Sequence, residues 1–161
     1  MKTPIIIASH NEGKAREIRA LLAPLGFTVH SAAGLSLPEP EETGATFEAN
    51  AELKAHAAAT AANMSALADD SGLVVTALGD APGIYSARWA GPAKDFAIAM
   101  QRVERELVER GVTPTGAAAY FVCALSFSTP EGKLTTVRGE VHGTLAFPAR
   151  GLHGFGYDPI F

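Results

Sequence analysis

Apolar and polar residues follow one another along the chain in blocks that predict alternating strands and helices. The first apolar block, residues 4–8, is rich in isoleucine and too short for a helix, so it indicates a buried strand. A polar loop at 9–13 follows, then a helix from about Lys14 to Leu22 and a second strand at 27–30. The inner face expected for this helix is Ala15, Ile18, Leu21 and Leu22. A strand, a polar loop and a helix in this order are typical of an α/β fold.

The remaining blocks predict two more helices, a short strand and a hairpin. The helices span about 46–63 and 94–110, and between them residues 65–68 form a short strand that ends at two aspartates. The long strands, about 117–128 and 134–143, flank a turn with proline and glycine and should pair as a hairpin. The buried face expected for the first of these helices is Phe47, Ala51, Ala55, Ala58 and Ala62, with Asn50 and Lys54 on another stripe.

Composition narrows the class of protein. The chain of 161 residues is 47% apolar and 19% charged, which fits one globular domain over residues 1–161. The net charge of −4 argues against a nucleic-acid partner, and no apolar run is long enough to span a membrane. No signal peptide is recognisable, so we expect a cytoplasmic protein. The lone Cys123 lies in an apolar run and is expected to be buried.

The loop after the first strand is a candidate phosphate-binding site. Its residues are Ser9, His10, Asn11, Glu12, Gly13 and Lys14. Such a loop exposes unpaired N–H groups at the positive end of a helix dipole, and Lys14 adds a cation. The spacing is not that of a Walker P-loop. An ordinary capped helix with a solvated Lys14 explains the same residues, so this motif alone does not decide.

Two pairs of acidic residues form a candidate site for a divalent cation. Successive residues at a strand end point to opposite sides, so only one of Asp69 and Asp70 can face a given pocket, and Asp70 is the better candidate. Asp69 is then a cap or an outer acceptor. Mg²⁺ prefers one or two carboxylates together with water and substrate phosphates, which Glu42 and Asp70 could provide. Turn aspartates and surface glutamates remain the alternative.

The loop near the end of the sequence combines glycines, aromatic rings and an acid. In Gly154–Asp158, Phe155 could stack on a flat base, and Asp158 could reach the polar edge of that base or a loop N–H. A structural turn with a buried aromatic residue is at least as good an explanation of this motif by itself.

Five motifs in one order resemble the inosine/xanthosine triphosphate pyrophosphatase (Ham1-like) family. They are Ser9–Lys14, Glu41–Ala55, Ala68–Leu73, Ala81–Arg88 and Gly154–Phe161, and the resemblance covers nearly the whole chain, from Ile5 to Phe161. It implies an elongated mixed β-sheet flanked by helices, with a central nucleotide cleft.

The resemblance also implies a reaction and its residues. A deaminated purine nucleoside triphosphate, such as dITP, ITP, XTP or dXTP, is hydrolysed to a monophosphate and pyrophosphate with Mg²⁺, by a homodimer. Glu42 and Asp70 hold the metal, and Asp70 is also the general base. The expected substrate-binding residues are Ser9, His10, Asn11, Glu12, Gly13, Lys14, Lys54, Ser71, Phe155, Gly156, Tyr157 and Asp158.

The sequence differs from the family pattern in one respect, and two other functions stay open. Family members continue past Asp-Pro-Ile-Phe into a helical segment with a lysine and a Ser-His-Arg motif, whereas this sequence ends at Phe161. A non-catalytic nucleotide-binding fragment is one alternative, although Asp70 argues against it. The other is a Maf-like phosphatase or pyrophosphatase acting on modified nucleotides, which the motifs Ala81–Arg88 and Phe155–Asp158 disfavour.

Overall fold

The computed structural model describes residues 3–161, which divide into two compact units. Unit 1 comprises the chain up to Asp70 together with Ala124–Arg138. Unit 2 comprises Ser71–Cys123 and Gly139–Phe161. Three strands contribute residues to both units, because the unit boundaries fall inside them. The single domain expected from the sequence therefore stays a prediction.

One five-stranded mixed sheet contains all the strands, as the sequence and its resemblance predicted. Its order is β2-β1-β3-β4-β5. The bounds are β1 Pro4–Ile7, β2 Thr28–Ser31, β3 Ala66–Val75, β4 Ala118–Ser128 and β5 Leu134–Thr144. Strand β1 pairs in parallel with both β2 and β3. The turn at 129–133 is short enough that β4 and β5 must run antiparallel.

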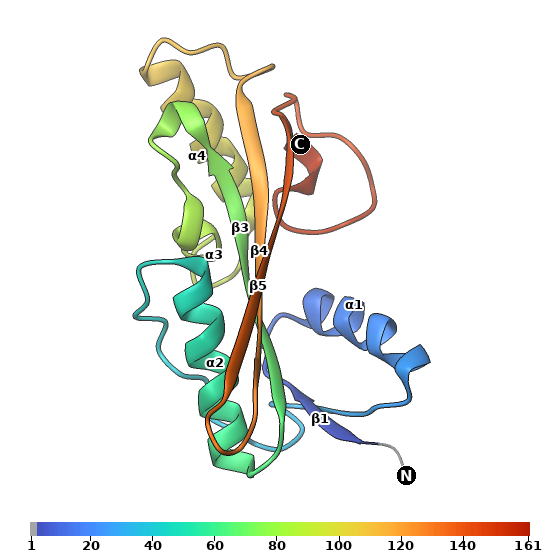
Figure 1. The fold of residues 1–161 in the computed structure, drawn as a ribbon. Helices are drawn as coiled ribbons and strands as arrows, with labels where there is room; N and C mark the ends of the chain where they lie inside the picture. Colours follow the sequence, from blue (N-terminus) through green and yellow to red (C-terminus); the bar gives the residue numbers. More distant parts are fainter. Residues whose placement is uncertain (1–2) are drawn as a thin grey trace. The chain divides into compact units, whose positions relative to one another are not determined.

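Helices flank the strands within each unit (Figure 1). Unit 1 contains α1 Glu12–Leu22, η1 Ala23–Leu25 and α2 Phe47–Ala62. Unit 2 contains α3 Ser86–Trp89 and α4 Phe96–Glu109, with short 3₁₀ turns η2 Thr76–Leu78, η3 Gly83–Tyr85 and η4 Asp158–Ile160. Among residues 3–161, no helix is long and apolar enough to cross a membrane.

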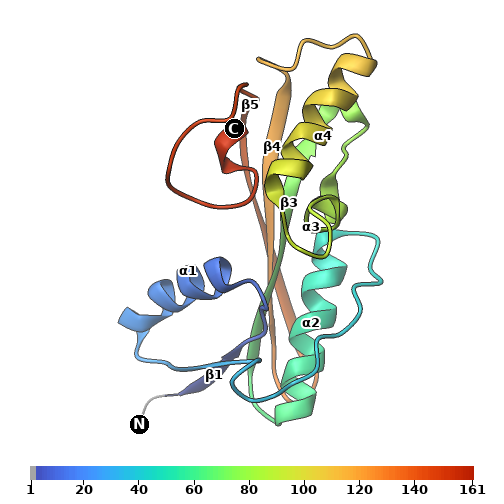
Figure 2. The same cartoon turned by 180° about the vertical axis from the view of Figure 1, so that it is seen from behind.

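Unit 1 is built around a core of small side chains. Ile6 on β1 is fully buried and packs with alanines of α2 and β3. The core residues are Ile6, Ala8, Ala32, Ala55, Ala58, Ala59, Ala66 and Ala68. Alanine on both surfaces lets the helix approach the sheet closely. Both ribbon views place α2 beside β3 and the hairpin, with α1 on the other side of these strands (Figures 1 and 2).

Unit 2 has a separate and larger core. Its buried residues are Leu73, Val75, Leu78, Ala90, Ala99, Val103, Leu107, Ala117, Ala119, Leu145, Tyr157 and Ile160. The apolar stripe of α4 provides Ala99, Val103 and Leu107, spaced four residues apart as an amphipathic helix requires. Met100 packs against this core while partly exposed, as does Phe96. This core brings Leu73 and Val75 of β3 together with Tyr157, the residue just before η4.

Three local predictions were wrong. The short strand predicted to end at the aspartates is one continuous strand, β3, which runs through Asp69 and Asp70. Leu21, expected on the inner face of its helix, is 74% exposed, and Ala15 is the one buried residue of α1. Cys123 is exposed, since it lies between the buried Val122 and Ala124 on a strand whose side chains alternate.

Candidate functional site

The loop between β1 and α1 is a well-formed helix start. Asn11 is its N-cap, and the Asn11 Oδ1 atom accepts a hydrogen bond from the Lys14 N–H at 3.1 Å. Ser9 Oγ accepts from the Asn11 N–H at 3.2 Å. Glu12 and Gly13 occupy the first two helical positions, where N–H groups have no partner inside the helix. The helix cap considered as the alternative for this loop is present, and the geometry also leaves two amides that suit an anion.

The lysine of this loop contacts the first of the two aspartates. Lys14 Nζ lies 3.7 Å from Oδ2 of Asp69, whose side chain is 6% exposed. Asp70, the next residue on β3, contacts a different lysine. The two aspartates therefore point to opposite faces of the strand, as the sequence predicted, although they lie within the strand rather than at its end.

Glu42, Lys54 and Asp70 form a compact cluster of charges in unit 1. The ammonium nitrogen of Lys54 lies 3.0 Å from Glu42 Oε1 and 3.7 Å from Asp70 Oδ1. Lys54 projects from α2, whereas Glu42 comes from the loop before that helix and Asp70 from β3. One cation thus bridges two carboxylates that are 28 residues apart in sequence.

The electrostatics of the cluster favour a proton acceptor. Burial raises the pKa of Asp70, Lys54 lowers it, and Glu42 raises it again, so that the pKa is about 6. Burial alone would lower the pKa of Lys54, but the carboxylates of Asp70 and Glu42 raise it by more, and the lysine stays charged. A carboxylate with a pKa near neutrality, next to a fixed cation, can take a proton from water and release it again.

The cluster also fits a divalent cation. Within residues 3–161, Asp70 Oδ2 is a buried oxygen that receives no hydrogen bond. A buried carboxylate oxygen without a donor is costly, so it indicates a missing electropositive partner. Together with Glu42 it supplies the hard oxygen ligands that Mg²⁺ prefers, with room in its coordination sphere for substrate phosphates.

The aromatic loop of unit 2 is stabilised by its own aspartate, Asp158. Asp158 Oδ2 accepts a hydrogen bond from the Phe155 N–H at 3.0 Å. Gly154 has a φ of +82°, and a Cβ there would collide with the Asp158 carboxylate, so the loop needs glycine at this position. Phe155 is 36% exposed. The loop therefore presents one aromatic ring to its surroundings while its acid is used to shape the turn.

Tyr157 belongs to the core of unit 2. Its side chain is 3% exposed, and its ring packs edge to face with Phe96 at 5.4 Å between centroids. Its hydroxyl donates to the Ser86 carbonyl at 2.7 Å. Burial raises the pKa of this phenol, so it stays protonated. Tyr157 is therefore the buried aromatic residue considered as the alternative for this motif, and Phe155 is the accessible aromatic ring.

Removing the Tyr157 hydroxyl should reduce stability. In Tyr157→Phe the Ser86 carbonyl loses its donor in a buried setting, and the expected loss is about 1–2 kcal/mol in the free energy of unfolding. Urea denaturation followed by circular dichroism measures it. The matched control is Tyr120→Phe, because Tyr120 is only partly buried and its ring stacks on His142. Equal stability of Tyr157→Phe and the wild type would contradict the buried hydrogen bond.

Sequence reasoning missed two buried polar residues of these sites. Asn50, 2% exposed, accepts a hydrogen bond from the Gly44 N–H at 2.8 Å through its Oδ1 atom. Ser86, 4% exposed, accepts from the Leu73 N–H at 3.0 Å and donates to the Gly83 carbonyl at 2.6 Å. The signal for Asn50 was its position one helical turn before Lys54. The signal for Ser86 was weak, because serine is common in loops.

The predicted site residues fall into both units. Those of unit 1 are Ser9, His10, Asn11, Glu12, Gly13, Lys14, Glu42, Lys54 and Asp70, and those of unit 2 are Ser71, Phe155, Gly156, Tyr157 and Asp158. The central cleft that the resemblance implies between them stays a prediction.

The fold is a mixed β-sheet with a capped loop suited to an anion and a buried lysine–carboxylate cluster. These features are typical of α/β enzymes that act on phosphate compounds. The chain belongs to the Ham1 family, whose model matches residues 5–161. It is 60% identical over 158 residues to a dITP/XTP pyrophosphatase of Bradyrhizobium sp., covering 98% of this chain and 74% of that protein. It is 61% identical over 157 residues to one from Rhodospirillum centenum, covering 98% and 77%.

Solved structures agree with this assignment. A HAM1 protein from Coxiella burnetii superposes with a TM-score of 0.88 at 37% identity, covering 99% of this chain and 81% of that one. The Staphylococcus aureus Ham1 protein gives a TM-score of 0.83 at 41% identity, covering 99% and 80%. The family and the fold class predicted from the motifs are confirmed.

Proposed function

We propose that this chain hydrolyses deaminated purine nucleoside triphosphates, dITP, ITP, XTP or dXTP, to the monophosphate and pyrophosphate, and so removes these bases from the nucleotide pool. The observation that carries the proposal is the buried carboxylate of Asp70, with one oxygen beside Lys54 and the other without a donor. The family assignment supports the proposal, and so do the two relatives, which are named dITP/XTP pyrophosphatases.

The residues of unit 1 suggest how the phosphates are bound. The amides of Glu12 and Gly13, which have no partner inside the helix, lie at the start of α1, where an anion is favoured by the helix dipole. Lys14, in the same turn, would add a cation. Lys54 adds a second cation next to the acidic cluster. Bound in this way, the triphosphate would have its negative charge offset along its length, which lowers the barrier to attack at the α–β link.

Asp70 is the proposed general base. Its pKa of about 6 means that it is ionised at pH 7 yet basic enough to accept a proton. The donor-free Oδ2 atom is the one available to a water molecule, since Oδ1 lies on the Lys54 side. The water is deprotonated as it attacks phosphorus in line with the leaving pyrophosphate, and Lys54 holds the carboxylate in place throughout.

Glu42 and Asp70 are the residues that would hold Mg²⁺. When bound, the metal offsets phosphate charge and lowers the pKa of a coordinated water.

The remaining parts of the proposal are the oligomeric state and the recognition of the purine: we propose a cytoplasmic homodimer in which Phe155 stacks on the purine ring. Ser71 and the backbone of the loop Gly156–Asp158 would complete the substrate contacts, since the side chains of Tyr157 and Asp158 are hydrogen-bonded within the protein. A 6-keto group distinguishes inosine and xanthine from adenine, and an N–H aimed at it rejects the amino group of ATP.

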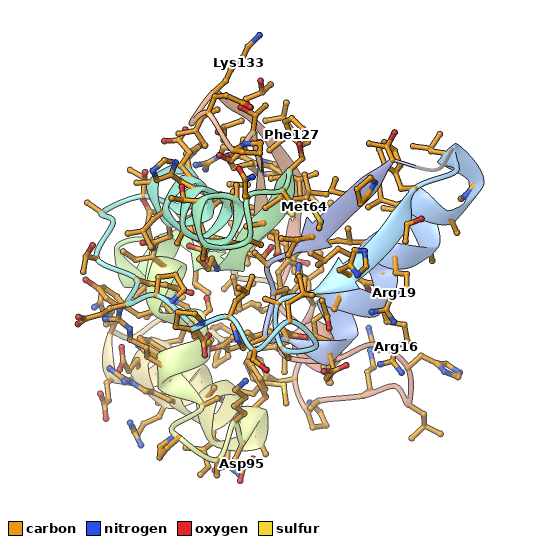
Figure 3. All side chains as sticks on the ribbon, turned by 90° about the horizontal axis from the view of Figure 1, so that it is seen from below. Arg16, Arg19, Met64, Asp95, Phe127 and Lys133 are labelled. Carbon is orange, nitrogen blue, oxygen red and sulfur yellow. The ribbon has the colours of Figure 1, made fainter. Side chains whose placement is uncertain are left out.

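Replacing Lys14 should weaken substrate binding without changing base preference. Lys14→Ala is expected to raise KM for dITP about 10-fold and for XTP equally, because a charged contact to phosphate contributes the same for either base. Steady-state kinetics with both nucleotides measure this. Arg16→Ala is the control: Arg16 projects from the exposed side of α1 (Figure 3) and should leave KM unchanged. A change in the dITP to XTP ratio without a change in KM would remove Lys14 from the phosphate site.

The proposed function is tested with a nucleotide panel. Pyrophosphate release is measured from dITP, XTP, dGTP and dATP in the presence of Mg²⁺. We expect release from dITP and XTP at least about 100-fold faster than from the other two, the discrimination that one unpaired polar group in a pocket can give. Faster turnover of modified pyrimidine or methylated nucleotides would favour the Maf-like alternative, and nucleotide binding without turnover would favour the binding module.

A further inference from the structure

Asn50 is a buried polar residue near the start of a helix, α2, whose other buried residues are apolar. It is 2% exposed and lies on α2, four residues before Lys54 and therefore on the same side of the helix. Asparagine is a poor helix former, and its buried carboxamide needs partners for both its oxygen and its nitrogen. The position therefore costs stability unless the side chain has a specific use.

The carboxamide oxygen contacts the loop that carries Glu42. The Oδ1 atom of Asn50 accepts a hydrogen bond from the Gly44 N–H at 2.8 Å, two residues after Glu42. The same side chain acts on Asp70 electrostatically: it lowers the pKa of that carboxyl, because an N–H donor favours the ionised form. Asn50 is thus linked to both carboxylates of the acidic cluster.

Gly44 shows that the contact between loop and helix is close. A Cβ on Gly44 would lie 2.6 Å from Asn50 Oδ1 and 2.9 Å from the Ala49 Cβ. Gly44 has no left-handed φ, so space rather than backbone conformation accounts for the glycine. The loop is also fixed at the helix start, where Thr46 Oγ1 accepts from the Ala49 N–H at 3.1 Å. The segment carrying Glu42 is thus pinned to α2 at two points.

We propose that Asn50 is a positioning residue, whose carboxamide holds the Glu42 loop against α2 and so fixes the Glu42 carboxylate beside Lys54 and Asp70. The inference rests on the proposed function. Lys54 Nζ lies 3.0 Å from Glu42 Oε1 and 3.7 Å from Asp70 Oδ1, so a shift of the Glu42 loop would also disturb the lysine next to Asp70. Asn50 acts through Asp70 and Glu42, and it has no contact with the nucleotide in this account.

The test is a double-mutant cycle on the Gly44–Asn50 contact. Asn50→Ala removes the carboxamide, and Gly44→Ala pushes it away from the loop. Each single variant should lower kcat for dITP at least about 30-fold with KM changed less than about 3-fold, since misplacing a reacting group by an ångström costs about 100-fold. The double variant should be no worse than the poorer single one, because both changes break one contact.

Glu52→Ala is the matched control. Glu52 lies on the same helix but on a different face, two residues after Asn50, and accepts a hydrogen bond from Thr136 Oγ1 at 2.8 Å, so its removal weakens the packing of α2. We expect a lower Tm for Glu52→Ala with kcat within about 2-fold of the wild type, as for a purely structural contact. This control separates positioning of the acidic cluster from general stability of α2.

The outcomes separate this inference from the proposed function. Wild-type kcat in Asn50→Ala, or additive losses in the double variant, would overturn the role of Asn50 while leaving the pyrophosphatase in place. A kcat loss in Glu52→Ala equal to that in Asn50→Ala would also overturn it. Absence of pyrophosphate release by the wild-type chain would overturn the proposed function and, with it, any role of Asn50 in that reaction.

Discussion

Replacing Asp70 by asparagine is expected to lower kcat for dITP by about 1,000-fold or more, with the affinity for nucleotide largely kept. The variant loses the proton acceptor and one of the two carboxylates proposed for the metal, and loss of a general base alone typically costs 100- to 10,000-fold. The phosphate loop around Lys14 is unchanged, so binding persists. Stopped-flow or steady-state pyrophosphate release gives kcat, and calorimetric titration with dITP gives the affinity.

Asp69→Asn is the matched control for this prediction. Asp69 is the neighbouring residue on β3 and at least as buried, but it contacts Lys14 instead of Lys54. We expect Asp69→Asn to change KM more than kcat, because it acts on the phosphate-binding lysine. Wild-type turnover in Asp70→Asn, or an equal loss of kcat in both variants with no change in KM, would contradict the role of Asp70.

The same substitution is expected to stabilise the protein without metal. The folded-state pKa of Asp70 is about 6, above the ordinary value of 3.8, because burial disfavours the charged form. The folded protein therefore binds this proton more tightly than the unfolded chain, and stability rises as pH falls from about 6 to about 4. At pH 7 the buried charge costs up to about 3 kcal/mol, which Asp70→Asn would remove in whole or in part.

The measurement is urea denaturation of both proteins with EDTA at several pH values. The difference in unfolding free energy, variant minus wild type, should be about 1–3 kcal/mol at pH 7 and should shrink toward pH 4, because the wild-type Asp70 is then protonated. Taking the difference removes the contribution of the other titrating groups. A variant less stable than the wild type at pH 7, or a difference independent of pH, would show that the buried charge of Asp70 is not destabilising.

Hydrophobic patterning was sufficient to predict most helices and strands. The run of isoleucines, the alanine-rich helix and the paired strands around a proline–glycine turn all have strong local signals. The pattern failed where function interrupts it. Asp69 and Asp70 end the apolar run at 66–68, so the strand seemed to stop there, but main-chain pairing continues through them to Val75. A central strand can contain buried aspartates when lysines of other elements contact them, as Lys14 and Lys54 do here.

Tertiary contacts decided the features that the sequence did not predict. Asn50 and Lys54 were placed on one stripe from their spacing, but only the structure shows that Asn50 is bonded to Gly44 and buried with the cluster. Tyr157 and Phe155 both adjoin Gly156, and their different exposure depends on the core of unit 2 around Phe96. Such partners lie far away along the chain, so no local pattern records them.

The most direct test of the central claim is to identify the products of dITP by ³¹P nuclear magnetic resonance with Mg²⁺ and the wild-type chain. Cleavage at the α–β link predicts the signals of a nucleoside monophosphate and pyrophosphate, appearing together in equal amounts and absent from the Asp70→Asn reaction. Orthophosphate with a nucleoside diphosphate, or no change in dITP, would contradict the account.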